Sequence, residues 1–177
     1  ELLQVTLICY EDGARSLSAN IPPGDSRSFS IEVRDGVELT CLLGALPIVE
    51  FGTAEQQQRY LPALASDTAK FSAAIAELAM NPAVVTTVTA TREKEGWVLC
   101  GDRAVVPDGA VADFILVPAE NDAGQQTVFI IDTRTPGVSV QPVAIGLPGY
   151  RAANLSLDNV TVDDSAVLGA VGPGAEV

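Results

Sequence analysis

The sequence predicts an α+β fold, with N-terminal helices in residues 1–70 followed by an antiparallel β-sandwich or barrel domain in residues 71–177. Three observations predict it. The spacing of apolar residues changes from a helical period to a period of two near Phe71. The second half then consists of short apolar or β-branched runs bounded by turn residues. No helical pattern lies between those runs, which favours antiparallel neighbours over a parallel sheet with crossover helices.

The first helix is expected over residues 3–17, where apolar residues recur at steps of four and three. They are Leu3, Leu7, Tyr10, Ala14 and Leu17. The Pro22-Pro23-Gly24 run ends this helix. Residues 28–33 alternate weakly and are interpreted as a short hairpin arm or a loop.

Two further helices are expected before the β-domain. The second spans residues 37–51, bent or broken near Pro47 and ended by Gly52. Thr53 is a plausible N-cap for the third, and Glu55 falls where a carboxylate suits the positive end of the helix dipole. Pro62 is expected to divide the third helix into two pieces.

The strands of the second half are expected where β-branched or apolar residues are concentrated. These runs are residues 84–91, 97–100, 114–117 and 128–131. Turns are expected at Glu95-Gly96, Pro136-Gly137 and Pro148-Gly149. Hydrophobic residues make up 47% of the chain, which is enough for a substantial core.

Charge and composition exclude several classes of function. Ten basic residues face 23 acidic ones, giving a net charge of −13, so neither nucleic acid nor an anionic membrane surface is an expected partner. Histidine is absent, which removes histidine-based nucleophilic sites and most zinc sites. The separated cysteines Cys9, Cys41 and Cys100 are interpreted as buried free thiols of a cytoplasmic protein.

Four segments of the sequence resemble motifs of the acyl-CoA dehydrogenases. They occur in the same order as in that family and at compatible spacing. Residues 52–66 read GTAEQQQRYLPALAS, similar to the family's GTEEQKQRYLPxLASGE helix. Residues 96–103 read GWVLCGDR, similar to GYVLNGTK, and the register continues to Asp113 without a gap. Residues 135–138 read TPGV, and residues 155–162 read LSLDNVTV, similar to LxFDNVRV.

The resemblance implies a helical N-terminal domain, a middle β-domain, FAD as cofactor and a CoA thioester as substrate. The reaction it implies is α,β-dehydrogenation, with a proton leaving the α carbon and a hydride passing from the β carbon to the flavin. On this resemblance, we expect the family's C-terminal helical bundle to be absent from this sequence. Because most members carry the glutamate base in that bundle, no catalytic residue is named here.

The resemblance also indicates which positions would meet the flavin, and several have lost the expected chemistry. A flavin needs hydrogen-bond donors at its ring edge and an apolar or aromatic wall over one face. At the family's Leu-Thr segment stand Ile75 and Ala76, so the hydroxyl is missing but two backbone amides remain. At its Trp-Ile-Thr segment stand Val105, Val106 and Pro107, and proline also lacks an N–H.

These substitutions leave three hypotheses. The favoured one is a subunit with a degraded flavin site that belongs to an FAD-dependent complex, with FAD shared with or supplied by another acyl-CoA dehydrogenase-like subunit. Its substrate would be an acyl-CoA or a sterol-derived CoA thioester, because some bacterial members of the family are built from two unlike subunits and act on such esters. The alternatives are a fully catalytic FAD-dependent dehydrogenase and a β-sandwich module without redox chemistry.

Overall fold

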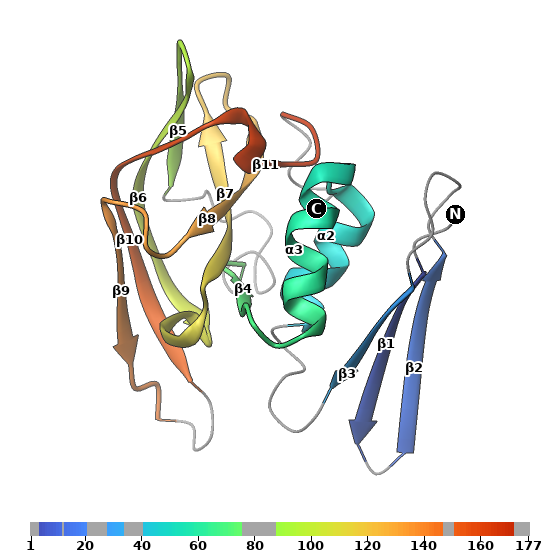
Figure 1. The fold of residues 1–177 in the computed structure, drawn as a ribbon. Helices are drawn as coiled ribbons and strands as arrows, with labels where there is room; N and C mark the ends of the chain where they lie inside the picture. The colour runs from blue at the N-terminus through green and yellow to red at the C-terminus, as the bar shows by residue number, and fades with distance from the viewer. Residues whose placement is uncertain are drawn as a thin grey trace.

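The computed structural model describes residues 4–11, 13–20, 28–33, 41–75, 88–146 and 151–171, with side chains from Leu43 onward. A small N-terminal sheet, a pair of helices and a larger β-domain follow one another along the chain. In Figure 1 the helices lie between the two sheets. No helix within the described ranges is long and apolar enough to cross a membrane.

The N-terminal sheet has the strand order β2-β1-β3. Its strands are β1 (Gln4–Glu11), β2 (Gly13–Asn20) and β3 (Ser28–Val33). β1 pairs antiparallel with β2, with Glu11 opposite Gly13, and parallel with β3. Strand β3 occupies residues 28–33, which the sequence predicted to be either a hairpin arm or a loop. This strand contacts helix α3.

The helix expected over residues 3–17 is wrong, because β1 and β2 occupy this segment. Two features of the sequence explain the strands. Val5, Thr6 and Ile8 are β-branched and favour an extended backbone. The dipeptide Asp12-Gly13 is a strong hairpin signal. In addition, β1 pairs with a strand on each side, and these pairings outweigh the weak helical spacing of its apolar residues.

The helices begin with a π-helical turn η1 (Cys41–Ala45), continue as α2 (Leu46–Phe51) and resume as α3 (Ala54–Ala65). Pro47 stands at the start of α2, where a missing N–H costs nothing, and Gly52 ends that helix as expected. Thr53 caps α3 through a reciprocal capping box with Gln56, which confirms the predicted N-cap.

Pro62 does not divide α3, contrary to the expectation. The helix continues through it to Ala65. Pro62 lies in the last turn, so it removes one intrahelical hydrogen bond close to the point where the helix ends anyway.

Within the described residues, the β-domain is one eight-stranded sheet in the order β11-β8-β7-β5-β6-β10-β9, with β4 paired to β7. Its strands are β4 (Phe71–Ala73), β5 (Thr89–Glu93), β6 (Gly96–Pro107), β7 (Phe114–Asn121), β8 (Gln126–Asp132), β9 (Val138–Val143), β10 (Ala152–Val162) and β11 (Val167–Leu168). Short 3-10 turns η2 (Gly109–Val111) and η3 (Asp164–Ala166) join some of them. Most pairs of the described strands are antiparallel, and among these strands only β4 and β5 run parallel to β7.

The sheet curls until strands that are not neighbours face each other. Trp97 on β6 and Phe129 on β8 make an edge contact with ring centroids 5.5 Å apart, although β5 and β7 lie between those strands in the sheet. The enclosed core contains Leu99, Ile115 and Ile131, each fully buried. A sandwich-like β-domain entered from helices is therefore confirmed.

Two smaller expectations are only partly met. The strand expected over residues 84–91 is described from Thr89, and residues 84–87 lie outside the described ranges. Cys100 is a free thiol but is half-exposed rather than buried, because it lies on the outer side of β6. The side chains of Cys9 and Cys41, and the turn expected at Pro148-Gly149, also lie outside the described part.

Helix α3 is fixed to the β-domain by aromatic and polar contacts. The Tyr60 ring meets the rings of Phe71 and Phe114 at centroid distances of 5.4 and 5.2 Å. The buried Gln56 amide donates to the carbonyl oxygens of Ser165 and Val167, both at 2.8 Å. The predicted entry helix therefore packs directly on the strands that follow it.

Candidate functional site

The strand that precedes Ile75 contacts the end of β6, where Val105, Val106 and Pro107 lie. Ile75 follows β4, and residues 105–107 end β6. The Ser72 hydroxyl donates a hydrogen bond to the carbonyl oxygen of Pro107, and Ser72 is 1% exposed. This buried contact fixes the end of β4 beside the end of β6.

The end of β6 contains a β-bulge. Arg103 pairs with Leu155 and Val106 pairs with Ala153, so two residues of β6 lie opposite Asn154 alone. The second of them, Val105, has a φ of +55°. A left-handed backbone is unusual for a β-branched residue and costs about 1–2 kcal/mol. The Val105 N–H donates to Oδ1 of Asn154 at 3.3 Å.

The predicted cofactor-binding residues have different surroundings. Ile75 is half-buried, and Val105 is half-buried at the bulge. The Val106 side chain is fully buried in the core of the β-domain, which leaves only its backbone for any ligand. Pro107 is buried and has no amide hydrogen. Ala76 lies outside the described residues.

The described residues do not fit a flavin edge that depends on side-chain donors. Ile75, Val105 and Pro107 have only apolar side chains, and the Val105 amide is already bonded to Asn154. The Ile75 amide donates to no other residue in the described part of the chain. Ile75 therefore offers a backbone donor, and Ile75, Val105 and Pro107 offer apolar surface to a ring system.

An apolar pocket of about 260 Å³ adjoins this site where the helices meet the sheet. Ile75 contributes to its lining, which otherwise comes from η1, α2, β4, β7 and β8. The other lining residues are Leu43, Leu46, Pro47, Glu50, Phe51, Ala73, Leu116 and Val128. Glu50 is the one ionisable group among them, and it is exposed. Such a pocket suits the hydrocarbon part of a ligand.

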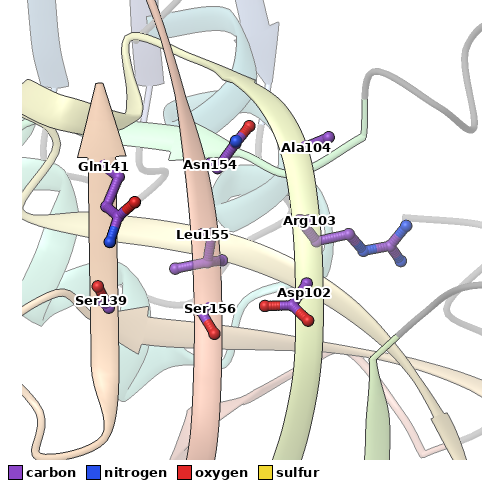
Figure 2. Close-up of a pocket in the computed structure, with 8 residues that line it drawn as sticks. All are labelled: Asp102, Arg103, Ala104, Ser139, Gln141, Asn154, Leu155 and Ser156. Atoms are coloured by element: carbon purple, nitrogen blue, oxygen red, sulfur yellow. The ribbon is translucent and has the colours of Figure 1, made fainter. Parts of the chain in front are cut away.

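A polar groove of about 390 Å³ lies on the outer face of β6, β10 and β9. Figure 2 shows the residues that line it on the three strands. They are Asp102, Arg103, Ala104, Ser139, Gln141, Asn154, Leu155 and Ser156. Sequence reasoning missed this groove, although the alternation of polar residues along β9 and β10 was a usable signal.

The charged groups near η3 form a structural link rather than a catalytic pair. The Arg92 guanidinium binds the Asp164 carboxylate and lies over the Trp97 ring, and the indole N–H donates to Asp164 at 3.1 Å. Arg92 holds the pKa of the Asp164 carboxyl below its usual range. Within the described ranges, no group of three His, Cys, Asp or Glu residues could hold a metal ion.

Comparison with known proteins gives two family matches. Residues 71–160 match the acyl-CoA dehydrogenase middle domain, and residues 29–68 match the acyl-CoA dehydrogenase N-terminal domain. A probable acyl-CoA dehydrogenase of Bacillus subtilis is 33% identical over 89% of the chain and 27% of its own length. A mitochondrial 2-methylacyl-CoA dehydrogenase of Solanum tuberosum is 32% identical over 85% of the chain and 38% of its own length.

Solved structures agree with these matches. An acyl-CoA dehydrogenase from Bacillus anthracis complexed with FAD superposes with a TM-score of 0.69 and 30% identity, over 76% of this chain and 24% of that one. A glutaryl-CoA dehydrogenase from Mycobacterium smegmatis in complex with FADH2 superposes with a TM-score of 0.65 and 29% identity, over 74% of this chain and 36% of that one. The chain thus spans well under half the length of these relatives.

Proposed function

The chain belongs to the acyl-CoA dehydrogenase family, and we propose that it is part of a subunit of an FAD-dependent enzyme that α,β-dehydrogenates a CoA thioester. We further propose that its own flavin site is weakened and that a second acyl-CoA dehydrogenase-like subunit supplies or shares the FAD. The division into a partial N-terminal domain, residues 1–70, and a middle β-domain, residues 71–177, belongs to the same proposal, although the described residues before Arg34 form strands rather than helices.

One observation carries the weakened site: the Val105–Pro107 segment has no side-chain donor, and two of its three residues offer no free backbone N–H. The Val105 amide is bonded to Asn154, Val106 points into the core, and Pro107 has no N–H. Family members use this segment to meet the ring edge where negative charge develops on hydride transfer. Each hydrogen bond missing from that edge weakens binding by about 0.5–1.5 kcal/mol.

The apolar pocket supports a role in holding the acyl group. It adjoins Ile75, so an acyl chain inside it would lie next to the predicted flavin position. Its volume of about 260 Å³ lies just below the roughly 300–1,000 Å³ of pockets that enclose drug-sized ligands. We therefore favour a compact acyl group over a sterol-derived one as the part of the thioester that this pocket binds.

Co-expression tests this proposal. The chain is purified alone and together with a related acyl-CoA dehydrogenase subunit, and the visible absorption and the dehydrogenation of short acyl-CoA esters are measured for both. We expect a colourless, inactive chain on its own and a yellow, active complex with the partner.

Other results would favour other functions. A chain that purifies alone with stoichiometric FAD and oxidises acyl-CoA is a complete catalytic dehydrogenase, and the proposed weakening is then wrong. A chain that stays colourless and inactive with every such partner is a β-domain without redox chemistry, and the proposed activity is then wrong.

A further inference from the structure

Strands β6 and β10 contain two bulges, and the residues at their left-handed positions differ in an informative way. In one bulge, between the pairs Leu157–Gly101 and Val160–Leu99, the left-handed residue is Asn159 with a φ of +50°. Asparagine tolerates this conformation. In the other, the left-handed residue is Val105, which does not. A strained backbone persists only where its surroundings hold it in place.

Asn154 is the contact that holds the strained bulge. As the single residue opposite Ala104 and Val105, it stands across the bulge, and its side-chain carbonyl accepts the Val105 N–H at 3.3 Å. A bulge takes its extra residue out of the regular strand pairing, so this amide needs a different acceptor. Figure 2 shows Asn154 on β10, between Gln141 on β9 and Ala104 on β6.

The Asn154 side-chain carbonyl accepts from the backbone N–H that a ligand carbonyl at the predicted flavin edge would use. Val105 is one of the predicted cofactor-binding positions, and it has a backbone N–H that can donate a hydrogen bond. Pro107, another of these positions, has no backbone N–H and cannot serve as a donor in its place. The amide can donate one strong hydrogen bond, so the side chain and a ligand carbonyl compete for it.

We propose that Asn154 is a positioning residue that occupies the Val105 amide and thereby lowers the affinity of this chain for the carbonyl edge of a flavin ring. This inference rests on the proposed function and explains part of the proposed weakening. It predicts that removing the Asn154 side-chain carbonyl strengthens flavin binding, which is an effect that simple structural damage does not produce.

The test compares variants of the whole chain by titration with FAD, followed through the fluorescence of the free flavin. Asn154→Ala removes the competing acceptor, and we expect its dissociation constant to fall about 2- to 12-fold below that of the wild type. Asn154→Asp keeps an acceptor and should bind no more tightly than the wild type. Gln141→Ala is the matched control, because Gln141 lines the same groove on β9.

Hydrogen exchange of the Val105 amide gives a second readout. We expect faster exchange in Asn154→Ala than in the wild type, and slower exchange again when FAD is added to the variant. Equal dissociation constants for Asn154→Ala, Gln141→Ala and the wild type would overturn the role of Asn154. A wild-type chain that already binds FAD tightly would refute the proposed weakening instead. The ratio of the dissociation constants of Asn154→Ala and the wild type tests the role of Asn154 independently of that result.

Discussion

Replacing Gln56 with leucine tests how helix α3 is fixed to the β-domain. The Gln56 side chain is 5% exposed and makes three hydrogen bonds. It accepts from the Thr53 N–H at 2.9 Å and donates to the carbonyl oxygens of Ser165 and Val167. Leucine has a similar size, so the substitution removes the hydrogen bonds without leaving a large cavity.

The expected loss follows from those three bonds. At about 1 kcal/mol each, Gln56→Leu should lower the free energy of unfolding by about 3 kcal/mol. In a chain of this length, about 1 kcal/mol shifts the melting temperature by roughly 2–4 °C, so we expect a decrease of about 6–12 °C. Urea unfolding followed by the fluorescence of Trp97, the single tryptophan, measures the free energy directly.

Gln58→Leu is the matched control, because Gln58 lies on the exposed side of the same helix. It should change the free energy of unfolding by no more than about 0.5 kcal/mol. If Gln56→Leu and Gln58→Leu unfold at the same urea concentration, the polar link between α3 and β11 does not stabilise the fold, and this reasoning is refuted.

Two further predictions concern the β-domain. At the left-handed position of Asn159, the variant Asn159→Gly should be more stable than Asn159→Ala by about 1 kcal/mol in urea unfolding, and equal stabilities would contradict the strained backbone. Arg92 lowers the pKa of Asp164 in the folded state. The ionised carboxylate therefore stabilises the fold at pH values above the unfolded-state pKa of about 3.9. This stabilisation is lost as the pH falls through the folded-state pKa. Asp164→Asn should therefore flatten the pH dependence of unfolding below about pH 4, and an unchanged acid profile would show that the carboxylate contributes nothing.

The sequence predicted elements whose signals are local. Thr53 and Gln56 form the capping box of α3 three residues apart, and Gly52 ends the helix before it. The apolar runs at 114–117 and 128–131 lie within β7 and β8, and every residue of the two runs except Phe114 is buried. In each case the pattern needs no knowledge of a distant partner.

Features that depend on distant partners were not predictable in the same way. The pairing of β1 with β3 supports strands in a segment whose apolar spacing suggests a helix. The match to the family's N-terminal domain begins at residue 29, well before the recognised motif at Gly52. At the candidate site, the partner of Val105 lies 49 residues away in the sequence. Nothing in Ala104-Val105 signals a left-handed bulge, since the usual glycine or asparagine is absent.

An equilibrium titration of the wild-type chain with FAD, on protein purified without a partner, measures whether the flavin site of this chain is weakened. We predict a shallow curve without a break at one flavin per chain when protein and ligand are mixed at roughly micromolar concentration. A sharp break at one FAD per chain, with the flavin retained through gel filtration, would contradict it.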